Sequence, residues 1–180
     1  KVVNESEQTT WYDGGTLMHL LETVYIGSDR NLVDMRFPVQ LVTRPDLNFR
    51  GFAGTLASGV VRPGDEVTIL PSRVTSTVKE VLGPDGPVDE AFAPMAATLT
   101  LDTEVDASRG DMIVRTNNQP QVAQAFEAML VWMDDQPLEA GKGYLVKHTT
   151  RQTPGQVSEL RYRVDVNTLA SHDASTLKLN

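Results

Sequence analysis

RFPVQLVTRPDLNFRGFAGTLASGVV, residues 36–61, contains two apolar-rich runs on either side of a turn. Pro45-Asp46 ends the first run, because proline fixes its own φ and disfavours helix at the residue before it. The second run carries three glycines among its apolar residues: Gly51, Gly54 and Gly59. This pattern predicts a β-hairpin whose second strand bends or bulges at its glycines.

These glycines do not have the spacing of a phosphate-binding loop. G-F-A-G-T-L-A-S-G matches neither G-x-G-x-x-G nor G-x-x-x-x-G-K-[ST], and no lysine follows it. We therefore expect Gly51, Gly54 and Gly59 to be structural, where two backbone segments cross closely at the corner of a barrel.

Short strands separated by turns continue the pattern after this stretch. The predicted strands span residues 66–70, 74–82, 97–101 and 112–114. Turn-forming compositions separate them, and the clearest is G-P-D-G-P at 83–87, which predicts a loop. Several short strands at this spacing favour an all-β fold with a closed antiparallel barrel.

The N-terminal residues predict a short helix at 16–24 followed by a polar linker. Apolar residues recur there at i, i+3, i+4 and i+7, which places them on one helix face: Leu17, Leu20, Leu21 and Val24. Thr16 is positioned to be the N-cap. Trp11-Tyr12, just upstream, is interpreted as an aromatic anchor before a turn.

The strand pattern restarts after a break at residues 116–120. We predict further strands at 126–132, 144–150 and 156–166. Apolar residues alternate from Leu160 to Val166, which is typical of a half-buried strand. The composition of 126–132 favours helix by propensity, so its assignment as a strand depends on the family resemblance described below.

Composition limits the classes of function. Of 180 residues, 40% are hydrophobic and 22% are charged, which is ordinary for a soluble globular protein. The net charge is −8 and no basic run is present, which disfavours nucleic-acid binding. Cysteine is absent, which excludes disulfides and thiolate chemistry. No stretch has the length needed to span a bilayer and no signal peptide is evident, so we expect a cytoplasmic protein with no membrane partner.

No residues are predicted to be catalytic, cofactor-binding or metal-binding. The three histidines, His19, His148 and His172, are far apart and lack the spacing of a zinc site. No G-x-S-x-G elbow supports a nucleophilic serine. Asp134-Asp135 could act as paired carboxylates, but a solvated pair before a proline-containing turn is the simpler interpretation.

Residues 108–111 spell Ser-Arg-Gly-Asp, which includes the tripeptide of adhesion ligands. The tripeptide precedes a short apolar strand, so we predict a tight turn at Gly110. We expect Arg109 to pair with a neighbouring acid.

The run Met35–Gly59 resembles the second domain of the GTPase subunit of bacterial sulfate adenylyltransferase (ATP sulfurylase), where it is close to MRFPVQ-x-V-x-RP-x-L-x-FRG-[FY]-AGTLASG. Upstream, Trp11–Val24 resembles the end of that family's GTPase domain. Translation elongation factor barrels are more distantly similar.

The resemblance implies three parts and an all-β fold. Residues 1–34 would be the end of the GTPase domain and a linker. Residues 35–116 would be a translation-factor-type barrel, and residues 119–180 part of a second, C-terminally truncated barrel. GTP and Mg²⁺ would be bound upstream of residue 1. The chain begins with lysine, so we expect an internal piece of a larger protein.

The implied function is that of a non-catalytic part of a GTPase subunit. In that family GTP hydrolysis drives the small catalytic subunit to make adenosine 5′-phosphosulfate from ATP and sulfate, during sulfate assimilation. The implied partners are the chain's own GTPase domain and the small subunit. A tRNA-binding pair of elongation factor barrels and a stand-alone interaction module are the alternatives, and salt-dependent tRNA binding would distinguish the former.

Five basic side chains are the candidate partner or interdomain surface: Lys147, His148, Arg151, Arg161 and Arg163. The first three lie at one predicted strand end. Arg161 and Arg163 alternate with apolar residues along the next predicted strand. An ordinary solvated sheet surface is the alternative.

Overall fold

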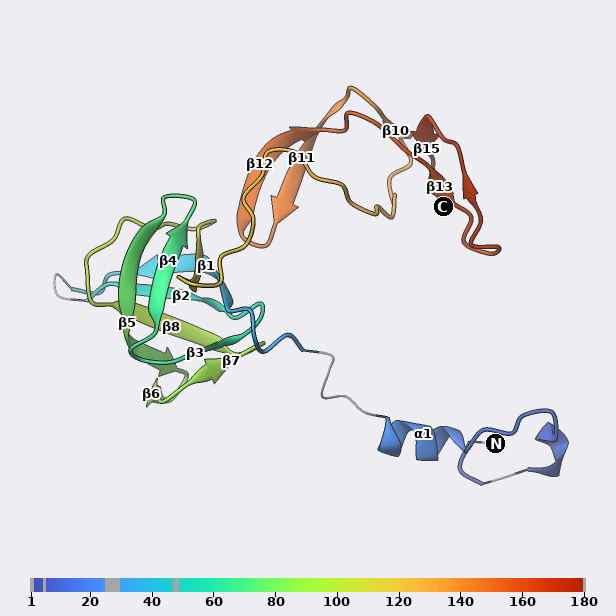
Figure 1. The fold of residues 1–180 in the computed structure, drawn as a ribbon, viewed down its shortest axis with the longest axis horizontal. Coiled ribbons are helices and arrows are strands. Elements are labelled where there is room, and N and C mark those ends of the chain that lie inside the picture. Colours follow the sequence, from blue (N-terminus) through green and yellow to red (C-terminus); the bar gives the residue numbers. More distant parts are fainter. Residues whose placement is uncertain (1, 5, 25–29, 47–48, 180) are drawn as a thin grey trace.

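A closed six-stranded antiparallel barrel forms the centre of the structure, which is a computed structural model describing residues 2–4, 6–24, 30–46 and 49–179. Its strands are β1 (Arg36–Thr43), β2 (Gly51–Thr55), β4 (Glu66–Leu70), β5 (Val74–Gly83), β8 (Ala96–Leu101) and β9 (Met112–Arg115). They follow the order β4-β9-β1-β2-β8-β5, and β5 pairs with β4 to close the ring. The predicted closed barrel is confirmed, and Figure 1 shows it with the rest of the chain extending from it.

The hydrophobic core fills the inside of this barrel. Every barrel strand contributes side chains that are almost completely buried, among them Phe37, Phe52, Ile69, Val78, Leu99 and Ile113. Burying one such side chain contributes about 1.5–3 kcal/mol to folding. Closure leaves none of these six strands with a free edge, so the barrel is stabilised by its own residues.

Strands β1 and β2 form the predicted hairpin, but the bulge lies in the first strand. Val39 pairs with Gly54 and Leu41 with Ala53, so Gln40 is the extra residue. A Cβ at Gly54 would collide with the carbonyl oxygen of Pro38 and lie 3.1 Å from the Phe37 ring. The predicted bulge in the second strand is therefore wrong, because the extra residue lies in β1 opposite Gly54. The predicted close approach of two backbone segments at these glycines is confirmed.

The other two glycines of the stretch also lie in crowded positions. A Cβ at Gly51 would lie 2.6 Å from Thr98 Cγ2. Gly59 has a φ of +79°, which favours glycine, and a Cβ there would collide with the Met35 backbone. The chain bends at Gly59 into β3 (Val60–Val61), which pairs with β7 (Ala91–Phe92).

The predicted loop at 83–87 is a tight hairpin instead. Strand β5 continues to Gly83 and pairs with β6 (Gly86–Val88), so only Pro84-Asp85 lies between the strands. Gly86 has a φ of +123°, a conformation that glycine adopts without strain and that the tight reversal requires.

Two short helical elements precede the barrel: the 3₁₀ helix η1 (Glu7–Thr9) and α1 (Leu17–Thr23). The side chain of Thr16 accepts a hydrogen bond from the His19 backbone N–H at 3.1 Å, so the predicted N-cap is confirmed. Residues 25–29 of the predicted linker lie outside the described residues. Figure 1 shows α1 apart from the barrel.

After the barrel, the chain forms three separate two-stranded sheets. They are β10 (Leu138–Glu139) with β15 (Thr176–Leu177), β11 (Gly143–His148) with β12 (Arg151–Gln156), and β13 (Arg163–Val164) with β14 (Ser171–His172). Leu138 is the one buried hydrophobic side chain among described residues 121–179. The overall fold is thus mostly β, with a barrel, small sheets and a short helix.

Two strands predicted in this region are wrong. Residues 126–132 form no strand, because no described segment pairs with them to complete a ladder. Of the predicted strand 156–166, only Arg163–Val164 is a strand beyond Gln156. The predicted strand 144–150 ends at His148, because Thr149, with a φ of +54°, starts the turn into β12.

Candidate interaction surfaces

The Ser-Arg-Gly-Asp segment forms the predicted turn and is tied to the barrel. Gly110 has a φ of +99° and its N–H donates to the Val39 carbonyl at 3.1 Å. The Asp111 carboxylate accepts from the Ser108 N–H at 2.9 Å. Arg109 donates to the carbonyl of Gln40 at 2.9 Å, so the expectation that it pairs with an acid is wrong. The exposed carbonyl of a bulged residue supplies the acceptor instead.

Two predicted surface residues, His148 and Arg151, lie at the tip of the β11–β12 hairpin. They are cross-strand partners, whereas Lys147 is paired with Gln152. The Arg151 guanidinium lies 4.0 Å from the Asp111 carboxylate. The hairpin tip therefore lies against the 108–111 turn of the barrel.

Arg161 and Arg163 lie elsewhere in the C-terminal region. Arg161 forms an ion pair with Glu127 at 2.7 Å, and both side chains are mostly exposed. Arg163 lies in β13, opposite His172. No interaction recorded among the described residues joins these two arginines to the hairpin tip, so the structure does not gather the five basic residues into one cluster. Whether they contact a partner stays a prediction.

The turn between β13 and β14 is fixed by Asp165. Its carboxylate accepts hydrogen bonds from the backbone N–H groups of Thr168 and Asn167, both at 2.9 Å, and from the Thr168 hydroxyl. These bonds, with a smaller contribution from the nearby His172 charge, lower the pKa of Asp165. The carboxylate stabilises this hairpin and is not a candidate acid or base.

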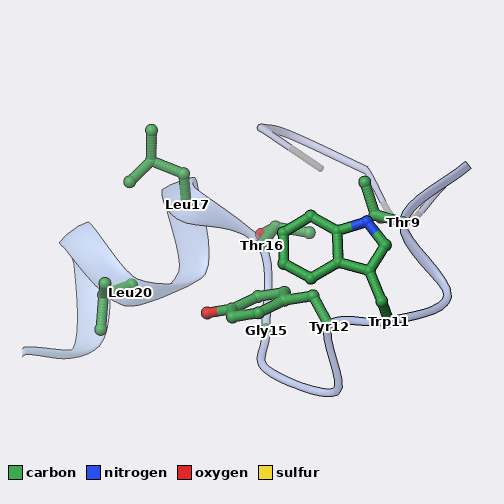
Figure 2. A pocket seen from close by; sticks show the side chains of 7 residues that line it. All are labelled: Thr9, Trp11, Tyr12, Gly15, Thr16, Leu17 and Leu20. Atoms are coloured by element: carbon green, nitrogen blue, oxygen red, sulfur yellow. The ribbon is translucent and has the colours of Figure 1, made fainter.

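An apolar hollow of about 310 Å³ lies beside α1. Figure 2 shows its lining: Thr9, Trp11, Tyr12, Gly15, Thr16, Leu17 and Leu20. The Trp11 and Tyr12 rings meet edge to face at 6.0 Å, yet Trp11 is 81% exposed. The apolar face of α1 is also exposed, including Leu20 and Leu21. The apolar stripe is evident from the sequence. The structure adds that none of the described residues covers it.

A second exposed apolar stretch runs through residues 122–133. Its exposed members are Val122, Phe126, Met129, Leu130, Val131 and Met133. Trp132 is held locally, because its indole N–H donates to the Gln136 carbonyl at 2.7 Å and its ring packs edge to face on Tyr144. Exposed apolar surface on this scale is typical of interaction sites.

A polar network that the sequence did not reveal joins the segments before and after the barrel. The Asp34 carboxylate accepts hydrogen bonds from the side-chain amides of Asn31 at 2.6 Å and Asn118 at 2.7 Å. These two bonds, and then the Arg36 charge, lower the pKa of Asp34. Asn31 and Asp34 have the spacing of a local side-chain turn, but Asn118 lies 84 residues from Asp34.

In the described part of the chain, no group of three or more His, Cys, Asp or Glu side chains could hold a metal ion. None of the helices found there is long and apolar enough to cross a membrane.

The fold of the chain is similar to that of known translation factors. Residues 125–180 match the family model for the GTP-eEF1A C-terminal domain-like family. A crystal structure of Sup35 complexed with GMPPNP superposes with a TM-score of 0.66 at 15% identity, covering 97% of this chain and 43% of that one. Translation elongation factor SelB from Methanococcus maripaludis, in its apo form, gives a TM-score of 0.60 at 16% identity over 91% of this chain and 35% of its own. The fold is therefore that of the barrel domains of EF1A-like translation factors.

Sequence comparison is more specific. The chain is 60% identical to the bifunctional enzyme CysN/CysC of Rhodopirellula baltica, covering 99% of this chain and 28% of the relative. It is 54% identical to sulfate adenylyltransferase subunit 1 of Teredinibacter turnerae, covering 99% of this chain and 38% of that one. The chain is homologous to the C-terminal, barrel-domain region of sulfate adenylyltransferase subunit 1. It spans about a third of the length of these relatives.

Proposed function

We propose that the chain is the non-catalytic barrel region of the GTP-binding subunit of a cytoplasmic sulfate adenylyltransferase. That subunit couples GTP hydrolysis to the synthesis of adenosine 5′-phosphosulfate and pyrophosphate from ATP and sulfate, in sulfate assimilation. The observation that carries the proposal is the 54% identity to subunit 1 along 99% of this chain. GTP and Mg²⁺ belong, in this proposal, to a GTPase domain upstream of residue 1.

The barrel region acts in this proposal as an intermediate between two partners. The GTPase domain of the same polypeptide covers the apolar face of α1 and the Trp11 hollow, whose exposure supports an intramolecular contact. The small catalytic subunit contacts the C-terminal region, where the basic hairpin tip and the exposed stretch 122–133 lie. Coupling then requires two arrangements with different contacts in each.

The direct test is co-purification with the small catalytic subunit from the same cell. The fragment and the small subunit are mixed and analysed by size-exclusion chromatography with light scattering, alongside the full-length large subunit with GTP. We expect a complex in at least one of the two mixtures. If neither the fragment nor the full-length subunit forms a complex, the proposal is wrong.

Charge variants then test the partner surface. Replacing the basic residues Lys147, Arg161 and Arg163 with alanine should weaken the complex, because the partner would lose complementary charge. Lys79→Ala, an exposed lysine on β5 of the barrel, is the matched control and should have no effect. Measurable GTP hydrolysis by residues 1–180 alone would contradict the assignment of the nucleotide site to an upstream domain.

A further inference from the structure

We propose that Asn31, Asp34, Arg36 and Asn118 form a connector clasp, which couples the segment entering the barrel (residues 30–35) to the segment leaving it (residues 116–120). In this proposal the two connectors open and close as one unit, so displacement of one loosens the other. The inference rests on the hydrogen-bond network and does not depend on the proposed function.

The entering connector is held first by its own side chains. The Asn31 side-chain oxygen accepts from the Val33 N–H at 3.0 Å and the Asp34 N–H at 2.9 Å. Its backbone carbonyl accepts from the Gly59 N–H at 2.6 Å. The Ser58 hydroxyl donates to the Asp34 carbonyl at 2.5 Å. Together these bonds fix the backbone of Asn31 and Asp34 at the end of the barrel.

The leaving connector is held through Asn118. The Arg36 guanidinium donates to the Asn118 backbone carbonyl at 2.9 Å and to its side-chain oxygen at 3.0 Å. The Asn118 side-chain N–H in turn donates to Asp34 Oδ1 at 2.7 Å. Each polar group of the Asn118 side chain therefore has a partner on the entering side of the barrel.

One carboxylate joins the two connectors. Asp34 Oδ2 accepts from Asn31, on the entering segment, and Oδ1 accepts from Asn118, on the leaving segment. Hydrogen bonds to a charged group are stronger than neutral ones, and removing one partner leaves the others less well oriented. Residues 30–35 precede β1 and residues 116–120 follow β9, so the clasp joins the two ends of the barrel's chain.

Residue-resolved hydrogen exchange of the full chain tests the clasp, because local opening is measured amide by amide. In Asn118→Ala, exchange at the Val33, Asp34 and Gly59 amides should accelerate about tenfold, the effect of losing one charge-assisted hydrogen bond. The reciprocal variant Asn31→Ala should accelerate exchange at the Asn118 amide, whose N–H donates to the Arg115 carbonyl. Amides of the core strands β2 and β8 should be unchanged.

The matched control is Asn117→Ala, an exposed neighbour of the same residue type, which should leave the entering connector unchanged. Asp34→Asn keeps the shape of the side chain but replaces one acceptor with a donor, and it should accelerate exchange on both connectors. If Asn118→Ala accelerates only amides of 116–120, or if Asp34→Asn affects one connector alone, the segments open independently and the clasp does not exist. If Asn118→Ala accelerates exchange throughout the core, that variant is destabilised as a whole, and the result for Asp34→Asn then decides whether the clasp exists.

Discussion

The barrel and the C-terminal region are both built from short strands, yet only the barrel has a core. Six strands close into a ring around Phe37, Phe52 and other buried side chains. Residues 121–179 form three isolated strand pairs, and Leu138 is their buried hydrophobic residue. A two-stranded pair alone is marginal in water. A strand pattern in this sequence therefore becomes a stable core only where the strand ladders close into a ring.

Truncating an apolar side chain should change the free energy of unfolding far more in the barrel than in the C-terminal region. Phe52→Ala should destabilise the barrel by about 3–5 kcal/mol, because it removes a fully buried ring and leaves a cavity. Leu145→Ala, in β11, removes a side chain that is 69% exposed and should change stability by less than about 0.5 kcal/mol. Denaturant unfolding of both variants measures the difference, and equal effects would contradict the comparison.

Glycine substitutions should also affect the barrel and the C-terminal region differently. Gly54→Ala should destabilise by about 1–3 kcal/mol, because the new methyl group meets the Pro38 carbonyl and the Phe37 ring. Gly143→Ala, at the start of β11, is the control, since no heavy atom lies within 4 Å of an added Cβ there. Thermal unfolding should show a lower Tm for the first variant only, and a stable Gly54→Ala would refute the close strand approach.

Limited proteolysis should distinguish the two regions without any mutation. Trypsin should cut first in the region C-terminal to Pro120, at exposed basic residues such as Lys147 or Arg161. Local opening is easier there because no closed barrel opposes it. The region 36–115 should persist as a resistant fragment in mass spectra taken over time. Early cuts at Arg73 or Lys79, inside the barrel, would show that the ring is less stable than its core suggests.

The smallest expected effect concerns pH and the connectors of the barrel. Asp34 has a lowered pKa, because Asn31 and then Asn118 donate hydrogen bonds to it and Arg36 lies nearby. Its contribution to stability is therefore full above about pH 4, the ordinary range of aspartate, and is lost as the pH falls through the lower folded pKa. Carbon NMR titration of the Asp34 carboxyl should show this low pKa. In Asn118→Ala the pKa should rise toward its ordinary value, and an unchanged pKa would contradict the assigned cause.

Local sequence signals predicted most of the barrel and the start of the short helix before it. The N-cap at Thr16, the β1–β2 hairpin and the turn at Gly110 each follow from neighbouring residues and are confirmed. The bulge at Gln40 was assigned to the wrong strand, because the crowding that decides it comes from packing against Gly54.

Features that depend on distant residues could not be predicted. Residues 126–132 were predicted as a strand from the family resemblance, against their helix propensity, but a strand also needs a partner, and the described residues supply none. The connector clasp requires Asp34 and Asn118 to meet across 84 positions, which no periodicity signals. The basic surface residues were identified by their charge alone, and charge does not indicate which of these side chains lie close to one another in the folded chain.

Hydrogen exchange across the whole chain tests the contrast between the two regions most directly. We predict that amides in β1, β2, β8 and β9 are the most protected and exchange together, as one cooperative unit. Amides in β10 to β15 should exchange much faster, except where a partner is added. Adding the small catalytic subunit, or using the full-length large subunit, should raise protection in 121–179. Equal protection in both regions of the isolated chain would contradict the claim that only the barrel is stabilised by its own residues.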